Sequence, residues 1–414
     1  MERLGFHYFA DQKHFTKRDL DKWLGKFVDS GASWIILDAP LEVAIPEYFI
    51  HSLVKADIKP ILHIKPRPID LFHTGQLDVL ISSYAKWGVK HMIFGDRPNL
   101  QESWSASLWA KYDPVEKYLD YFVPFAHQLL SNQISPILSP LEPGGDYWDT
   151  AFLRNTLQEL VKREEEKILA NLIISCYASP GEKHLDWGIG GQERWPNSRP
   201  YSSKKQKGED HFGFRIFDWY NTIAKAVLVK PLPIFLLGLH GSRFDDKPNS
   251  HLDIVRLLAG EQTNNASPLP EDVIGGAFLL PELAASISSD SKSSESNPNS
   301  SNAILKTIQE WLTEKDNSKS LQHSSAVISH YLLLPTYEWG IADWHLEIIK
   351  PFVKKYQPTI GFSIEEASHS QRVTILGSNQ VFPESILRQL RNQGILVERI
   401  EGNGTEIATL LAKL

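Results

Sequence analysis

One unit recurs along the first 285 residues: a short apolar run that ends near a polar residue, followed by a segment with apolar residues at helical spacing. The helical spacing is clear in Leu20, Trp23 and Phe27, and the next apolar run, Trp34–Leu37, ends at Asp38. Continuous apolar runs of this length predict strands buried on both faces, and the helical spacing predicts amphipathic helices. We expect eight strands, at Leu4–Tyr8, Trp34–Leu37, Pro60–Ile64, His91–Phe94, Ile134–Leu138, Leu172–Tyr177, Pro233–Leu237 and Val273–Leu279.

Strands that alternate with helices predict an α/β fold with a parallel sheet. Eight units within residues 1–285 suit a closed (β/α)8 barrel, the TIM barrel, better than an open doubly wound sheet. An open sheet with insertions is the alternative. It is disfavoured because no glycine-rich phosphate loop follows the first strand.

The composition changes after residue 285. Residues 286–302 are mostly Ser, Asn, Asp, Glu and Lys, so they cannot bury enough apolar surface to fold and predict a flexible linker. Residues 303–324 contain one helical pattern, which we expect to pack on the barrel or to bridge two domains. Strand and helix patterns alternate again in residues 325–414, which predicts a small open α/β domain of the Rossmann-like kind.

The bulk composition excludes several classes of function. A net charge of −7 argues against general nucleic-acid binding. Cys176 is the only cysteine, so no intrachain disulfide can form, which fits a reducing compartment. No apolar segment follows Met1–Gly5 as in a signal peptide, and no run of about 20 apolar residues spans a membrane. We therefore expect a cytoplasmic location and leave cell-surface association and the oligomeric state open.

The loop after the fifth predicted strand has an unusual composition. It contains Glu142, two glycines, the pair Tyr147-Trp148 and then Asp149. The chain has twelve tryptophans, several of them in loops rich in Gly and Pro, and exposed tryptophans often stack on sugar rings. The alternative is that these tryptophans fill a large core. The composition of the loop predicts a carbohydrate-binding pocket, with a polysaccharide or oligosaccharide as the partner.

Polar residues just beyond the strands of a closed parallel barrel converge on one mouth. Cleavage of a glycoside needs two carboxyl groups, and Asp96 and Glu142 follow neighbouring strands. We predict Glu142 as the acid, with its pKa raised by Trp148, and Asp96 as an ionised partner held by Arg97 or Lys65. Alternatively, Asp96 and Arg97 form a structural ion pair, and Glu142 stabilises a helix dipole. The residues expected to bind substrate are Asp38, His63, Lys65, Arg97, Trp148, Tyr177, Asp186, Trp187, Glu193 and His240.

Metal binding is a second chemistry that these strand ends permit. Four histidines lie at or near them, but none has the HxH or HExxH spacing of common zinc motifs. A lone histidine on a strand is more often a core residue with its hydrogen bonds satisfied. We therefore predict neither a metal nor a cofactor.

The turn Gly95-Asp96-Arg97-Pro98-Asn99 and the Trp-rich loops after strands five and six resemble the (β/α)8 glycoside hydrolases, most of all their retaining Glu/Glu clan. That clan carries Asn-Glu-Pro after strand four and a nucleophilic glutamate after strand seven. Here Asp96-Arg97-Pro98 and Leu237–Gly241 stand in those places. The resemblance implies a hydrolase of a cell-surface or cell-wall polysaccharide with a non-standard carboxylate pair. The missing glutamates favour the alternative, an inactive barrel that binds glycan or another partner.

The C-terminal segment resembles a bacterial cell-wall-binding repeat. The resemblance is carried by Val373–Gly377, Gly394, Val397–Gly402 and Thr405, the last of which we expect to cap the final helix. The resemblance implies attachment to a cell wall. The alternative is a generic small α/β domain.

Overall fold

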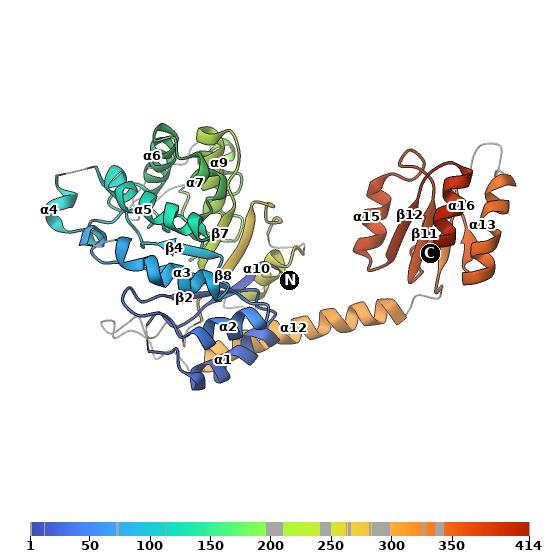
Figure 1. Ribbon diagram of the computed structural model, residues 1–414, viewed down its shortest axis with the longest axis horizontal. Coiled ribbons are helices and arrows are strands. Elements are labelled where there is room, and N and C mark those ends of the chain that lie inside the picture. The colour runs from blue at the N-terminus through green and yellow to red at the C-terminus, as the bar shows by residue number, and fades with distance from the viewer. Residues whose placement is uncertain are drawn as a thin grey trace. The chain divides into compact units, whose positions relative to one another are not determined.

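The structure is a computed structural model, and it describes residues 2–11, 13–71, 74–111, 113–195, 210–240, 250–261, 263, 266–280, 283, 299–324, 328–335 and 343–413. The chain divides into two compact units, Met1–Glu310 and Trp311–Leu414 (Figure 1). No helix among the described residues is both long enough and apolar enough to cross a membrane.

The first unit is a closed (β/α)8 barrel, so the predicted fold is confirmed. Its eight strands are all parallel, in the order β5-β4-β3-β2-β1-β8-β7-β6. The two ends of this order meet, because Leu138 N donates to Ile173 O at 2.9 Å and Ile173 N donates to Pro136 O at 3.2 Å. The strands are β1 (Leu4–His7), β2 (Trp34–Asp38), β3 (Lys59–Ile64), β4 (His91–Phe94), β5 (Ser135–Ile137), β6 (Ile174–Tyr177), β7 (Ile234–Leu239) and β8 (Val273–Phe278).

Amphipathic helices surround the strands. The first helix shows why: the Thr16 side chain accepts a hydrogen bond from Asp19 N and caps it, and Leu20, Trp23 and Phe27 are buried against the barrel. The helices of this unit are α1 (Lys17–Asp29), α2 (Glu47–Lys55), α3 (Asp78–Lys86), α4 (Ala106–Trp109), α5 (Pro114–Ser131), α6 (Asp149–Lys162), α7 (Glu166–Asn171), α8 (Gly191–Arg194), α9 (Ile216–Leu228) and α10 (Ser250–Leu258). Three 3-10 helices are η1 (Ile69–Leu71), η2 (Thr74–Leu77) and η3 (Gln101–Ser103).

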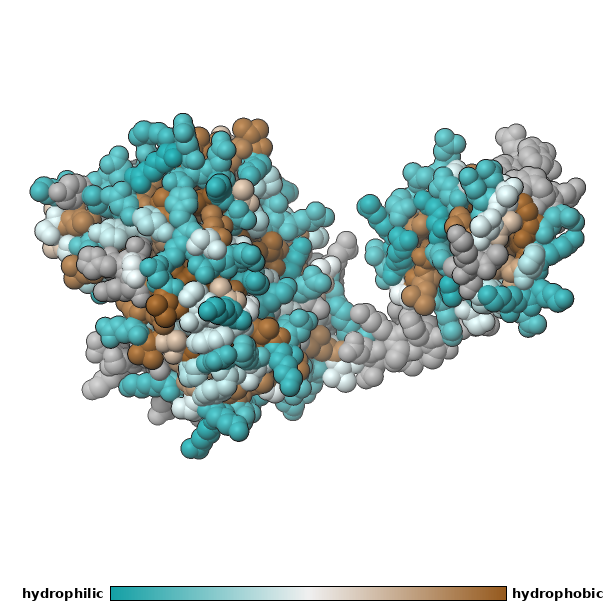
Figure 2. Space-filling view, in the orientation of Figure 1, coloured by the Kyte–Doolittle hydropathy of each residue, from teal (hydrophilic) through white to brown (hydrophobic). Residues whose placement is uncertain are grey.

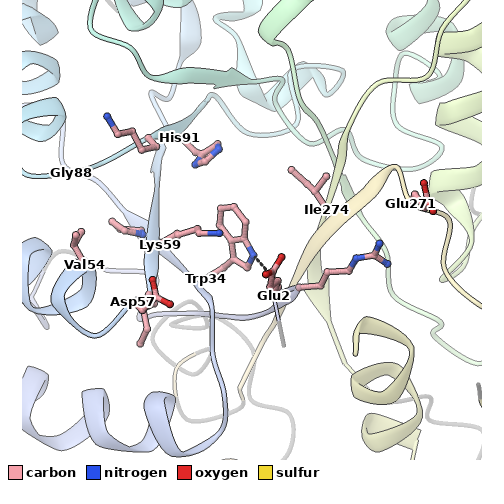
Figure 3. A pocket seen from close by; sticks show the side chains of 13 residues that line it. Glu2, Trp34, Val54, Asp57, Lys59, Gly88, His91, Glu271 and Ile274 are labelled. Carbon is pink, nitrogen blue, oxygen red and sulfur yellow. Dashed lines mark hydrogen bonds between the residues drawn. The ribbon is translucent and has the colours of Figure 1, made fainter. Parts of the chain in front are cut away.

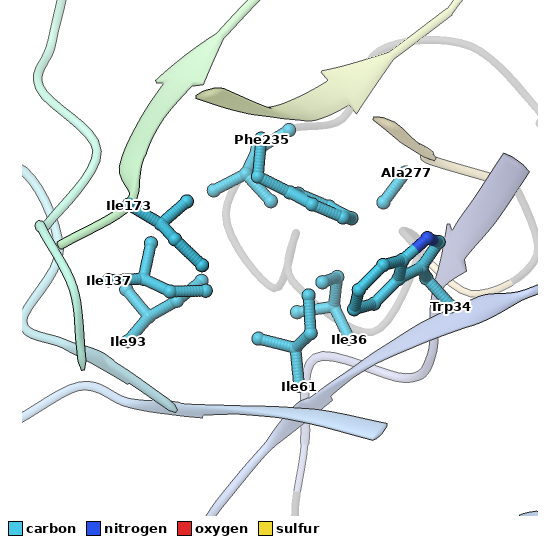
Figure 4. Close-up of a cluster of buried hydrophobic side chains, with 9 residues drawn as sticks. Trp34, Ile36, Ile61, Ile93, Ile137, Ile173, Phe235 and Ala277 are labelled. Atoms are coloured by element: carbon cyan, nitrogen blue, oxygen red, sulfur yellow. The ribbon is translucent and has the colours of Figure 1, made fainter. Parts of the chain in front are cut away.

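The barrel interior is packed and is not a pore. Figure 4 shows side chains from facing strands filling it, mostly isoleucines together with two aromatic rings. A filled interior leaves only the two ends of the barrel and its outer surface for ligands. The buried members of this cluster are Trp34, Ile36, Ile61, Ile93, Ile137, Ile173, Phe235, Leu237 and Ala277.

Helix α12 (Asn299–Ser324) begins earlier than expected. Its first four residues belong to the expected linker 286–302, whose residues 286–298 lie outside the described part of the chain. Leu305 and Ile308 are buried, and Lys26 Nζ donates to Asn302 Oδ1 at 2.8 Å, so these contacts stabilise the polar first turns. The border between the two units falls within this helix.

The second unit is a small open α/β domain, as predicted. Its four parallel strands have the order β10-β9-β11-β12. Apolar side chains alternate between the two faces: Leu333 packs in a cluster with Leu387 of α15, and Leu332 packs in a cluster with Phe352 of α13. The elements are β9 (Tyr331–Leu333), α13 (Asp343–Tyr356), β10 (Thr359–Gly361), α14 (Ile364–Ala367), β11 (Arg372–Leu376), α15 (Glu384–Asn392), β12 (Leu396–Ile400) and α16 (Gly404–Lys413).

The expected cap of the last helix is wrong by two residues. Asn403 Oδ1 accepts hydrogen bonds from Thr405 N and Glu406 N, both at 3.1 Å. Asn403 therefore caps α16, because its side chain reaches the free N–H groups of the first turn. Figure 2 shows hydrophilic residues over most of the visible face of both units, with apolar residues in separate patches.

Candidate functional site

A buried histidine, His63, and a half-buried histidine, His7, form part of the floor at the carboxyl end of the barrel. His63 Nε2 lies 2.8 Å from Gly95 O, and His7 Nε2 accepts from Gly238 N at 3.0 Å. A carbonyl can only accept, so His63 donates through Nε2 and its Nδ1 carries the lone pair, whereas His7 has the opposite tautomer. Burial, with the nearby charge of Lys65, lowers the pKa of each imidazole to about 3. Both rings are therefore neutral at neutral pH.

Asp38 and Lys65 form an ion pair beside these histidines. Lys65 Nζ lies 2.7 Å from Asp38 Oδ1 and 2.8 Å from Oδ2. Burial raises the pKa of Asp38, and the contact with Lys65 offsets only part of this shift. The pair brings together the ends of β2 and β3, as the strand pattern predicted.

Asp96 is buried and holds two partners. Tyr177 OH donates to its Oδ1 at 2.6 Å and Arg67 NH2 donates to its Oδ2 at 3.0 Å. Burial alone raises the pKa of Asp96, but the neighbouring His63, the positive charges of Arg97 and Lys65 and the Tyr177 hydrogen bond outweigh this, so its pKa is lowered. Asp96 is thus ionised, as expected. The guanidinium that binds it is nevertheless Arg67, because the loop after β3 reaches across to β4.

Arg97 pairs with Glu142 and not with Asp96. Its Nε lies 3.1 Å from Glu142 Oε2, although the N–H is not aimed well enough for a hydrogen bond. The Arg97 guanidinium also lies over the Tyr177 ring, 4.7 Å from its centroid. The expected Asp96–Arg97 ion pair is therefore wrong, because the turn directs the two side chains to different partners. Each of the two carboxylates faces its own arginine.

Asn99 joins the loops that follow β4 and β5. Its Nδ2 donates to Glu142 O at 2.8 Å and to Tyr147 O at 2.9 Å, and its Oδ1 accepts from Glu142 N at 2.9 Å. A Cβ on Gly145 would lie 2.5 Å from Asn99 Nδ2, so only glycine permits this close approach. The two loops are fixed relative to each other.

Between these loops lies a groove of about 1050 Å3. Trp148 is 46% exposed, whereas Trp104 is buried and its Nε1 donates to Pro98 O at 2.8 Å. The groove thus combines one accessible indole with the Arg97–Glu142 pair and further acids. Its lining residues are Arg97, Leu100, Gln101, Glu102, Trp104, Ala106, Glu142, Gly144, Gly145, Asp146 and Trp148. Four of the expected site residues lie in or next to this lining: Asp96, Arg97, Glu142 and Trp148.

Asp186 and Trp187 act as anchors of the loop after β6. Asp186 Oδ1 accepts from Arg215 NH2 and from Ser267 N, each at 2.9 Å. Burial raises the pKa of Asp186, but the bonds from Ser267 and Arg215 outweigh it and lower the pKa. The Trp187 ring packs 5.0 Å from that of Trp195. These contacts engage both side chains within the protein itself.

Two further expected residues lie apart from the groove lining. Glu193 is exposed on the short helix α8. His240 follows β7, and its Nε2 forms a hydrogen bond with Ser179 Oγ. Neither side chain lines the groove.

A buried cluster around Asp149 fixes the start of α6. Asp149 and His211 have no exposed surface, and His211 Nε2 lies 2.8 Å from Asp149 Oδ2. Tyr220 OH donates to the same oxygen at 2.9 Å, and Gly144 N donates to Oδ1 at 2.9 Å. This cluster ties the loop that carries Trp148 to α9 and to the end of the long loop after β6.

Sequence reasoning missed Arg67, Asn99 and His211. Arg67 stands between two prolines just after a predicted strand, which is a signal that could have marked it. The partners of Asn99 and His211 are 43 and 62 residues away, so no local pattern points to them. Among the described residues, no group of three or more His, Cys, Asp or Glu side chains is placed to hold a metal ion.

No protein-family model and no curated protein matches the chain. Several solved structures show a low similarity to it. An L-ribulose 3-epimerase is 9% identical over 77% of this chain and 97% of that chain, with a TM-score of 0.40. A GH128 endo-beta-1,3-glucanase from Sorangium cellulosum is 12% identical over 74% and 97%, with a TM-score of 0.37. A GH113 beta-1,4-mannanase is 10% identical over 76% and 99%, with a TM-score of 0.38. The barrel assignment rests on the strand pairing described above.

Proposed function

We propose that the groove between the loops after β4 and β5 binds a segment of a polysaccharide or oligosaccharide. The observation that carries this proposal is Trp148, a half-exposed indole at the rim of a groove with polar walls. An aromatic face can pack on the apolar face of a sugar ring, and charged groups can bind its hydroxyls. Arg97, Glu142 and Glu102 supply such groups around the indole.

Binding without cleavage is the form of this proposal that the contacts favour. Hydrolysis needs one carboxyl that gives up a proton and one that is free to attack or to activate water. Asp96 is bound by Arg67 and Tyr177, and Glu142 faces Arg97. Each carboxylate is thus already engaged by an arginine, and neither is free to take the role of acid or of nucleophile.

Hydrolysis with this carboxylate pair is the second candidate. It is supported by the ionised state of Asp96 and by the position of Glu142 in the groove lining. A polysaccharide of a cell surface or cell wall remains the proposed ligand class, on the strength of the C-terminal resemblance. Turnover that is lost in Glu142→Gln while binding persists would establish hydrolysis over binding.

The first experiment is a screen of the full chain against a soluble-glycan array, followed by calorimetry on any oligosaccharide that binds. We expect Trp148→Ala to weaken binding about tenfold, because the stacking surface is lost, and Trp148→Phe to retain most of the affinity. Val79→Ala is the matched control, since Val79 is 74% exposed on α3 and outside the groove. Unchanged affinity in Trp148→Ala would place the sugar elsewhere.

A further inference from the structure

A second cavity, of about 590 Å3, opens at the amino end of the barrel. It is lined by the first residues of three strands, Trp34 of β2, Lys59 of β3 and His91 of β4, and by Ile274 of β8 (Figure 3). Because all the strands are parallel, this is the end opposite the groove that contains Trp148. The cavity therefore does not belong to the site described above.

The inner wall of this cavity carries a buried nitrogen without a partner. Trp34 is 6% exposed, and its Nε1 donates to Glu2 O at 2.8 Å. The His91 ring lies edge-on to the indole, with their centroids 5.2 Å apart, and His91 Nδ1 has no hydrogen-bond partner among the described residues. A buried polar atom without a partner is unfavourable, because it has lost its hydrogen bonds to water. Because this nitrogen has almost no accessible surface, a ligand bonds to it only when the ring turns towards the cavity, and such a bond removes the penalty.

The charges nearest to His91 are positive. Lys59 Nζ lies 4.8 Å from the centroid of the Trp34 ring, at the same inner wall. Burial, together with the charges of Lys59 and Lys90, lowers the pKa of His91 to about 4, and no carboxylate contributes. Lys90 is exposed and also lines the cavity. His91 is thus neutral at neutral pH, and the ammonium groups of Lys59 and Lys90 are the charges that act on it.

Three acids also line the cavity. Glu2, Asp57 and Glu271 are exposed, as Lys59 and Lys90 are, but only the two lysines are among the charges that act on His91. Apolar side chains make up much of the remaining wall, including Ile58 and Ile274. The cavity therefore combines an apolar wall with two ammonium groups near His91, and its volume is within the range of small-molecule sites.

We propose that this cavity binds a small organic anion. Its phosphate or carboxylate group lies between Lys59 and Lys90, its body packs against the Trp34 and Ile274 side of the cavity, and a polar group bonds to His91 Nδ1. The proposal is independent of sugar binding at the other end of the barrel. It requires only that the two lysines and the imidazole act on one ligand.

The test is calorimetry of the full chain at low ionic strength with four probes and a neutral control. Inorganic phosphate and glucose 6-phosphate represent the phosphate source, citrate and glucuronate represent the carboxylate source, and glucose is the uncharged control. We expect at least one anion to bind and glucose not to bind. The kind of anion that binds more tightly, phosphate or carboxylate, then identifies the chemical group of the ligand.

Two substitutions test the assigned contacts. Lys90→Gln removes one charge at an exposed position, and His91→Phe keeps the ring but removes both nitrogens; each should weaken the anion at least tenfold. Lys167→Gln, an exposed lysine of α7, and Trp148→Ala, in the groove, should leave the anion affinity unchanged. If His91→Phe unfolds in a thermal melt, Lys90→Gln alone decides.

Three results would overturn the proposal. The first is no binding of any of the four anions at 10 mM. The second is binding that Lys90→Gln leaves unchanged. The third is an equal loss of affinity in Lys167→Gln, which would indicate a general effect of surface charge.

Discussion

Asn99 has no exposed surface, and its side chain forms three hydrogen bonds to the backbone of the loop after β5. Asn99→Ala leaves those backbone groups buried without partners, so we expect the free energy of unfolding to fall by roughly 2–4 kcal/mol. Urea denaturation measures this change. Asn132→Ala is the control, because the Asn132 side chain bonds only within the last turn of α5 and at its end, and it should lower stability by less than about 1 kcal/mol. Equal effects of the two substitutions would contradict the role assigned to Asn99.

At the scale of single residues, the sequence predicted which side chains meet at the mouth better than it predicted how they pair. Asp38 and Lys65 meet because both follow buried, adjacent strands. Asp96 bonds to Arg67 and Arg97 pairs with Glu142, and these choices depend on how the loops cross in three dimensions. An ion pair between Asp96 and Arg97 was expected because the two residues are adjacent in the sequence. Adjacency, however, contains no information on the direction of each side chain.

The loop after β6 is an element whose order depends on Asp186. Asp186→Asn removes the charge that Arg215 neutralises and leaves a buried guanidinium with a weaker partner. We expect faster trypsin cleavage after Lys183 or Arg194, which lie on the same loop, measured by mass spectrometry of timed digests. Glu193→Gln, an exposed change in the same segment, should cleave like the parent protein. Identical digestion of Asp186→Asn and the parent would show that other contacts hold the loop.

Strands were the most predictable elements. Each barrel strand overlaps its expected range, because a strand buried on both faces must be a continuous apolar run bounded by turns. The start of helix α12 was predicted less accurately. Its first turn, at Asn299–Asn302, has the composition of a disordered segment, and the buried contacts of Leu305 and Ile308 that accompany it are tertiary.

The whole molecule is expected to lose stability in mild acid. Burial holds the pKa of His7 and of His63 at about 3 in the folded chain, against about 6.5 when unfolded. The contribution of these two histidines to the free energy of unfolding is complete above pH 6.5. It declines as the pH falls towards 3, because the unfolded chain takes up protons first. Between pH 6.5 and 5 this amounts to up to about 2 kcal/mol for each buried histidine, measured as the free energy of unfolding in urea.

Substitutions of His91 and of His51 distinguish the effect of buried histidines from other causes of lower stability in acid. His91→Phe should lose less stability between pH 7 and 5 than the parent, since the pKa of His91 is lowered to about 4. His51→Gln should behave like the parent, because the His51 side chain is 52% exposed. A free energy of unfolding that stays constant from pH 7 to 5 would mean that the buried imidazoles are not held neutral.

The barrel closes where β5 meets β6, and there Leu138 N donates to Ile173 O, Ile173 N donates to Pro136 O, and Ser175 Oγ donates to Leu138 O. β5 is also the strand from which the Trp148 loop continues. This junction therefore lies on one side of β5, and the proposed sugar groove lies on the other. An occupant that bridges the two groove walls would thus tie the loop after β5 to the loop after β4, on the side of β5 away from the junction.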